Sequence, residues 1–124
     1  MIAIDEYLKG ILGQILASYK ILAELNDEPE DLLTIKKELS KIRGLLLVLS
    51  NKLDDKKYQQ DHQVSLFKLS TYYVDTYDFT REIEILAQIY YKDSSRLKNL
   101  RLLIINSLND KRLIEKFQTI LNEL

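Results

Sequence analysis

The sequence has few of the residues that small proteins use for special chemistry. It contains no cysteine and no tryptophan, one histidine, one proline and three glycines. The absence of cysteine excludes disulfides, thiolate metal sites and thiol catalysis. Because proline and glycine are scarce, few positions force a helix to end. With 46% hydrophobic and 30% charged residues, the composition is that of an ordinary globular domain.

Long hydrophobic runs are also missing. The longest purely apolar run covers residues 45–49, whereas a membrane helix requires about 20 apolar residues. The first residues have neither the basic region nor the continuous apolar stretch of a secretory signal. A chain of 124 residues is long enough to bury a core without a metal or a disulfide. We therefore predict a single cytoplasmic domain over residues 1–124, without a membrane span.

The strongest pattern in the sequence lies between Leu32 and Leu53, where apolar residues recur every three or four positions. The series is Leu32, Ile35, Leu39, Ile42, Leu46, Leu49 and Leu53. This spacing places an unbroken apolar seam on a helix of about six turns that packs lengthwise on its neighbours. Leu45, Leu47 and Val48 add apolar surface beyond the seam. Either this helix is central in the protein or its far side meets a second copy, so a homodimer is compatible with the sequence.

Three further segments have helical periodicity. The first covers residues 4–25 and contains Gly10 and Gly13, which we expect to allow a close approach between helices or, alternatively, to form a groove or hinge. The third covers residues 62–91; we favour one long helix there, although cap-forming residues gather near 76–80. The fourth covers residues 94–124. Its apolar stripe slips at Asn109-Asp110, so it is either one drifting helix or a helix followed by a short fifth one.

Charge alternates between these segments. The net charge is −5 over residues 1–34, +4 over 35–58, −3 over 59–91 and +3 over 92–124. Sequential neighbours in an antiparallel arrangement would then face opposite charge. The sequence predicts an all-α fold, namely an antiparallel up-down-up-down four-helix bundle, with the last helix either continuous or broken near Asn109-Asp110 into a short fifth helix.

No residue pattern indicates catalysis or cofactor binding. His62 is the single histidine and lies at an expected helix start, where capping or a bystander role is the usual explanation. Glu82 and Glu84 are two positions apart, which points them to different faces of a helix. The glycines are scattered through helical stretches and form no phosphate-binding loop. We expect no catalytic residues, no metal site and no cofactor, so we do not expect an enzyme.

Aromatic residues gather in the third segment. They are Phe67, Tyr72, Tyr73, Tyr77, Phe79, Tyr90 and Tyr91. Tyrosine suits surfaces that are dry at one end and wet at the other, including protein interfaces. Tyr72, Tyr77 and Tyr91 fit the inward stripes poorly and are therefore the predicted partner-binding residues. The leading hypothesis is a non-enzymatic protein–protein interaction module, such as an adaptor, an inhibitor or immunity-type protein, or an accessory subunit.

The alternative hypothesis is a small helical subunit associated with nucleic acid. Basic residues of the second and fourth segments would contact phosphates if the two segments presented a common surface. The candidates are Lys36, Lys37, Lys41, Arg96, Lys98, Arg101 and Arg112. The overall charge of −1 favours instead solvated basic faces that are balanced by acidic neighbours.

Overall fold

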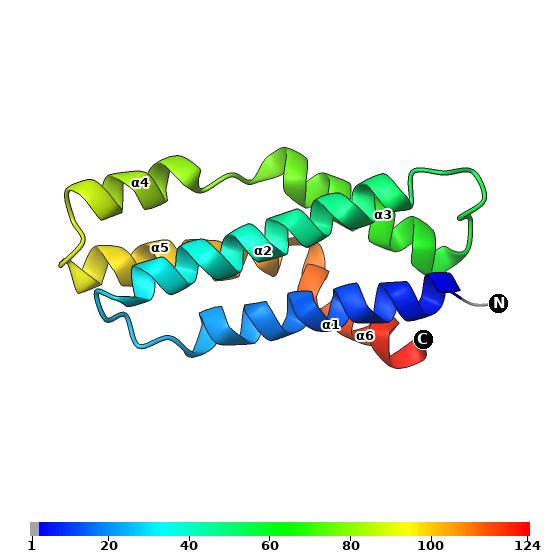
Figure 1. Ribbon diagram of the computed structural model, residues 1–124, viewed down its shortest axis with the longest axis horizontal. Coiled ribbons are helices and arrows are strands. Elements are labelled where there is room, and N and C mark those ends of the chain that lie inside the picture. Colours follow the sequence, from blue (N-terminus) through cyan, green and yellow to red (C-terminus); the bar gives the residue numbers. More distant parts are fainter. Residues whose placement is uncertain (1–2) are drawn as a thin grey trace.

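The computed structural model describes residues 3–124, and all regular structure in this range is helical (Figure 1). The elements are α1 (Ala3–Glu24), α2 (Asp31–Lys52), α3 (Asp61–Thr76), α4 (Thr80–Gln88), α5 (Ser94–Leu108), a 3₁₀ turn η1 (Asp110–Arg112) and α6 (Leu113–Glu123). The all-α class is thus confirmed. The helices in the described range are more numerous, and several of them shorter, than the sequence predicts. None of these helices is long and apolar enough to cross a membrane.

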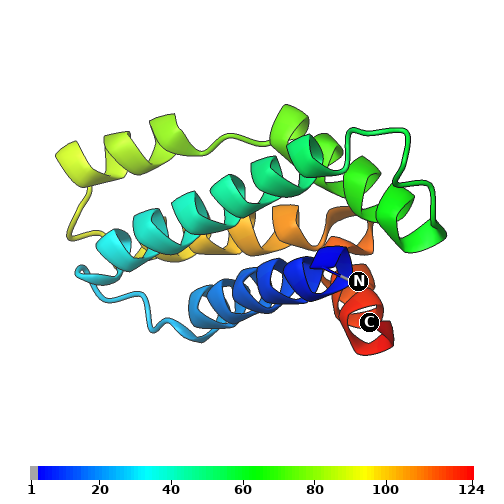
Figure 2. The ribbon, with the colours of Figure 1, turned by 45° about the vertical axis from the view of Figure 1, so that its right-hand side comes forward.

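The helices lie mostly lengthwise. α2 returns alongside α1, and α3 and α4 follow one another along α2 in the opposite direction (Figure 1). α5 packs against α4 and α1, and α6 turns away from the direction of α5 to pack against α1 and α3 (Figure 2).

The core is built on α2. Leu32, Ile35, Leu39, Ile42, Leu46, Leu49 and Leu53 are all buried, so the predicted seam is confirmed at every position. α1 contributes a matching stripe whose one polar member, Ser18, is also buried and donates a hydrogen bond of 2.8 Å to the buried Glu38 of α2. Since the partner of Glu38 is a neutral hydroxyl, this contact links α1 to α2 without an ion pair.

The prediction of one helix over residues 62–91 is wrong, because α3 ends at Thr76 and α4 begins at Thr80. Tyr77 adopts an extended conformation at the end of α3. The last carbonyls of a helix have no partner within it, and here Arg43 of α2 donates to two of them, the carbonyl of Tyr77 and, at 3.1 Å, that of Val74. Asp78 then accepts bonds from the amide and hydroxyl of Thr80, which starts α4.

The break near Asn109-Asp110 is present. Lys111 and Arg112 have φ values of 55° and 59°, in the left-handed region that side chains other than glycine seldom adopt. Asn109 closes α5 by donating from its side chain to the carbonyl of Ile105 at 2.9 Å and to the hydroxyl of Tyr19 at 2.8 Å. The phase slip in the sequence therefore marks a tight turn between α5 and α6.

The expected role of the glycines in close helix packing is not found. A Cβ atom placed on Gly10, Gly13 or Gly44 would meet nothing within 4 Å. Within the described chain these glycines thus leave open space beside the helices and serve no close approach.

Candidate functional site

Tyr72 and Tyr77 converge on one carboxylate. Both hydroxyls donate to Oδ2 of Asp110, at 2.5 Å and 2.6 Å, and their rings meet edge to face with centroids 6.4 Å apart. The two hydrogen bonds lower the pKa of Asp110, while the bond to Asp110 raises the pKa of each tyrosine. Lys111 lies over the Tyr72 ring, 4.2 Å from its centroid. This tyrosine clamp, composed of Tyr72, Tyr77 and Asp110, ties the joint between α3 and α4 to the left-handed turn before α6.

The three predicted partner-binding tyrosines are therefore not one patch. Tyr72 and Tyr77 are half-buried, and their hydroxyls are engaged within the chain. Tyr91 is 52% exposed and follows the other end of α4, which spans about 13 Å. Of the three, only Tyr91 presents a largely free ring, with Lys92 5.4 Å from its centroid.

Tyr73, between these residues, is a buried polar anchor. Its hydroxyl lies 2.9 Å from Oγ of Ser107, which itself donates to the carbonyl of Ile104 at 2.6 Å. Because serine has one proton to donate, Tyr73 is the donor to Ser107. Burial raises the pKa of Tyr73.

A hollow of about 100 Å³ lies at the joint between α3 and α4, against α2. Its walls include the Tyr77 and Phe79 rings, which are stacked with an interplanar angle of 7°. Two of its charged side chains are already engaged, Arg43 with the end of α3 and Asp78 with Thr80. The hydroxyl–carboxylate contact in its lining, Thr80 with Asp78, is the capping bond at the start of α4, so the geometry of the hollow gives no indication of catalysis.

A second, more open groove of about 260 Å³ runs between α4 and α5 on the outer side of the protein. Its lining residues are Glu82, Ile85, Leu86, Tyr90, Arg96, Asn99, Leu100 and Leu103. Ile85 of α4 and Leu103 of α5 both line it and are 41% and 56% exposed. Ile89, one helical turn after Ile85, is 64% exposed. Large aliphatic side chains from two helices thus share one solvent-facing groove.

Polar residues bound this α4–α5 groove. Arg96 lies over the Tyr90 ring at 3.7 Å and pairs with Asp93 at 3.3 Å, and Asp93 also caps α5 by accepting from the amide of Arg96. Lys92 and Lys98 line a different hollow, together with Asp27 and Glu28 of the α1–α2 connection. The charged residues of the groove lining are therefore Arg96, which is paired with Asp93, and Glu82 on the α4 wall.

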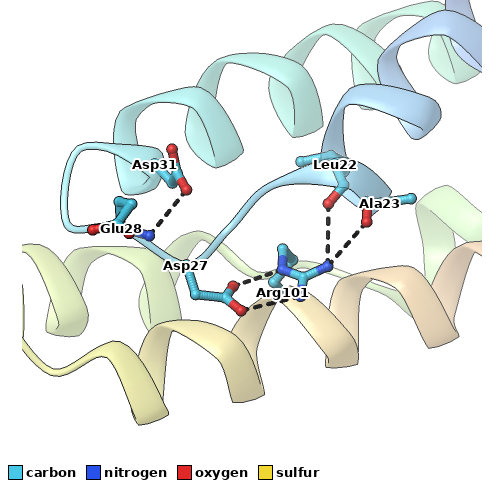
Figure 3. A network of polar contacts seen from close by, with 6 residues as sticks. All are labelled: Leu22, Ala23, Asp27, Glu28, Asp31 and Arg101. Atoms are coloured by element: carbon cyan, nitrogen blue, oxygen red, sulfur yellow. Dashed lines mark hydrogen bonds and ion pairs between the residues drawn. The ribbon is translucent and has the colours of Figure 1, made fainter.

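The predicted phosphate-contacting residues are not equally available. Arg101 forms two bonds to the carboxylate of Asp27, at 2.7 Å and 3.1 Å, and reaches the carbonyls of Leu22 and Ala23 at 3.4 Å each (Figure 3). Arg112 pairs with Glu115. Lys36, Lys37, Lys41, Arg96 and Lys98 are exposed. Arg101 instead acts as a cap for α1, whose last turn has no basic residue of its own.

His62 is half-buried at the start of α3, with Nε2 3.5 Å from Oδ1 of Asp5. In the described part of the chain, no three histidine, aspartate or glutamate side chains come together in a way that could hold a metal ion. The contact with Asp5 is thus the ion-pair contact of His62 in the described chain.

Comparison of the chain with protein-family models, curated proteins and solved structures gives no match.

Proposed function

We propose that this protein is a non-enzymatic interaction module whose docking surface is the α4–α5 groove. The observation that carries the proposal is the pair of large aliphatic side chains Ile85 and Leu103, which are exposed and line one groove from two adjacent helices, with the exposed Ile89 just after the end of α4. Single exposed apolar residues are common, but apolar residues gathered in a groove with a polar rim are typical of protein-binding sites. Of the sequence-predicted residues, Tyr91 lies near this surface, at the end of α4.

The proposed occupant is an amphipathic helix of a partner protein. A groove between two helices accepts a third helix whose apolar residues recur every three or four positions. Arg96 lines the groove on the α5 side and Glu82 lines it on the α4 side. Charge complementarity therefore favours a partner helix with an acidic side chain opposite Arg96 and a basic one opposite Glu82.

The test is a matched pair of substitutions on α5. Leu103→Glu places a charge in the groove, whereas Leu102→Glu alters the adjacent residue, which is 40% exposed but does not line it. A protein captured by the wild type and by Leu102→Glu, and lost with Leu103→Glu and Ile89→Glu, is then purified. Its affinity for the wild type should exceed that for Leu103→Glu by roughly tenfold or more, and should fall with salt.

Equal capture by Leu102→Glu and Leu103→Glu would exclude the groove as the docking surface. The alternative function would be supported if the wild type retained nucleic acid at low salt, if the double variant Lys36→Glu/Lys41→Glu lost that binding, and if Leu103→Glu kept it. The two functions are thus separated by which variants lose binding.

We also propose that the helices form an up-down-up-down bundle of four segments. The third segment would be α3 with α4, and the fourth α5 with α6, each broken by a side-chain-capped joint. The lengthwise courses of α1, α2, the α3–α4 pair and α5 support this arrangement (Figures 1 and 2).

A further inference from the structure

The outer sides of α1 and α2 carry two exposed series with a spacing of three and four residues. On α1 the series is Tyr7, Gly10, Gln14, Ala17 and Ile21, and on α2 it is Lys37, Lys41, Gly44, Val48 and Asn51. All ten residues are exposed. This spacing is that of helices packing lengthwise against a partner, yet the buried seams of α1 and α2 use other residues. Each helix thus has a second seam on its solvent side.

The two outer seams lie side by side. Lys52 of α2 sits over the Tyr7 ring, 5.8 Å from its centroid, and Ser18 bonds to Glu38. These contacts set the antiparallel register, which places Gly10 near the level of Val48, about one helical turn along the axis from Gly44. Residues 10–19 and 44–51 contain no charged residue, although 30% of the chain is charged. The seams therefore share an uncharged centre, as the middle of a protein interface does.

The glycines fit an interface better than they fit the isolated chain. Gly10 and Gly44 each destabilise their helices by about 1 kcal/mol relative to alanine. No neighbouring atom of the chain would clash with a Cβ at either position, so packing within the chain does not explain the glycines. Glycine in the middle of an outer seam allows the backbone of another helix to approach closely, while Tyr7, Ile21 and Val48, 42%, 43% and 37% exposed, supply apolar contact around it.

The charges on α1 and α2 indicate which helix of a second copy would pack on these seams. Every exposed charged residue of α2 is a lysine: Lys36, Lys37, Lys41 and Lys52. α1 has an exposed acidic residue near each of its ends, Glu6 and Glu24, although Lys9 and the exposed Lys20 lie between them and the uncharged stretch. In a dimer whose two-fold axis runs parallel to the helices, α1 of one copy lies over α2 of the other. The two helices run antiparallel, and residues that are level within one copy are also level between the copies. The Glu6 end then meets Lys52, and the Glu24 end meets Lys36 and Lys37.

We propose that the protein forms a homodimer in which the outer seam of α1 packs on the outer seam of α2 of a second copy. This surface is distinct from the α4–α5 groove, so it is independent of the proposed function. Self-association would leave the groove of each copy free for a partner.

The test uses Gly10→Leu and Gly44→Leu. Because a Cβ meets no atom within 4 Å at either position and leucine favours the helix, the monomer should be as stable as the wild type or more so. In the dimer, the leucine would separate the two seams and raise the dimer dissociation constant by roughly ten- to a hundredfold. Analytical ultracentrifugation over a concentration series measures that constant, and chemical denaturation checks the fold.

Val48→Glu should also weaken the dimer, whereas Asn106→Leu and Leu103→Glu, which alter exposed residues of α5, should leave it unchanged. A wild type that stays monomeric at the highest concentration would overturn the proposal. So would a dimer whose dissociation constant is the same in Gly44→Leu and Val48→Glu as in the wild type. A dimer lost on Leu103→Glu alone would place self-association in the groove and would also contradict the seam.

Discussion

Ser70 and Ser107 are both buried, but they differ in their hydrogen bonds. Ser107 bonds to Tyr73 and Ile104, whereas Oγ of Ser70 has no partner in the structure and the residue is 0% exposed. Ser70→Ala removes an unsatisfied hydroxyl and adds helix propensity, so it should raise the free energy of unfolding by about 1 kcal/mol. Ser107→Ala leaves the Tyr73 hydroxyl buried without an acceptor and should lower it by roughly 1–2 kcal/mol.

Urea denaturation of the two single variants measures both effects. If Ser70→Ala destabilised the protein as much as Ser107→Ala, a hydrogen bond to Ser70 would have to exist, and the assignment of Ser70 as unsatisfied would be wrong.

Arg101 and Asp27 form the most enclosed ion pair of the described chain, with side chains 11% and 14% exposed. Asp27 has a φ of 63°, which asparagine tolerates as well as aspartate does. Asp27→Asn therefore removes the charge without straining the backbone. In a double-mutant cycle with Arg101→Met, the coupling free energy should be about 1–3 kcal/mol.

Arg101→Met alone should cost more than Asp27→Asn, because it also removes the donor to the last carbonyls of α1. The matched control is Arg112→Met, since the Arg112–Glu115 pair is largely exposed and should contribute little. A coupling free energy near zero for Arg101 and Asp27 would contradict this prediction, because the ion pair would then contribute nothing to the free energy of unfolding.

At the scale of elements, the tyrosine clamp makes the α3–α4 joint and the α5–α6 turn sensitive to pH. Asp110 has a folded pKa below its ordinary value because Tyr72 and Tyr77 donate to it. Its contribution to stability is fully present above the unfolded pKa of about 4 and is lost as the pH falls through the lower, folded pKa. The stability difference between the wild type and Asp110→Asn should be largest near neutral pH and shrink in acid.

Denaturation at several pH values measures that difference. Tyr72→Phe and Tyr77→Phe should each show part of this pH-dependent loss of stability, since each removes one donor to Asp110. Asp75→Asn is the control, because Asp75 is an exposed residue of α3 that accepts none of the described hydrogen bonds. A pH-independent difference for Asp110→Asn would mean that the clamp does not stabilise the folded state.

Local signals predicted some element boundaries and missed others. The phase slip at Asn109-Asp110 located the turn after Leu108. The end of α3 was not identifiable, because Arg43, which accounts for it, lies 31 and 34 residues from the carbonyls it binds. Tyr72 and Tyr77 looked free for the same reason, since Asp110 is 38 and 33 residues away. Periodicity reveals which faces are apolar, but it does not reveal which distant side chain satisfies a helix end.

At the scale of the whole molecule, stability is unevenly distributed. α2 has seven buried residues, whereas α4 buries only Ile83 and Leu86, with the hollow at the joint on one side and the open groove on the other. Amides protected by few buried contacts exchange through local opening that costs less than global unfolding. Native-state hydrogen exchange should therefore give a lower opening free energy for α4 than for α2.

Ile83→Ala should lower the opening free energy of α4 further while changing that of α2 by less, because α4 would lose one of its two buried anchors. A partner bound in the α4–α5 groove covers the exposed side of the same helix and should slow exchange in α4 and α5 first. Slowing confined to α1 and α2 on raising the protein concentration would instead report the outer seams. If α4 and α2 exchanged together, with one free energy, the protein would open as a single unit, and docking could not act on α4 alone.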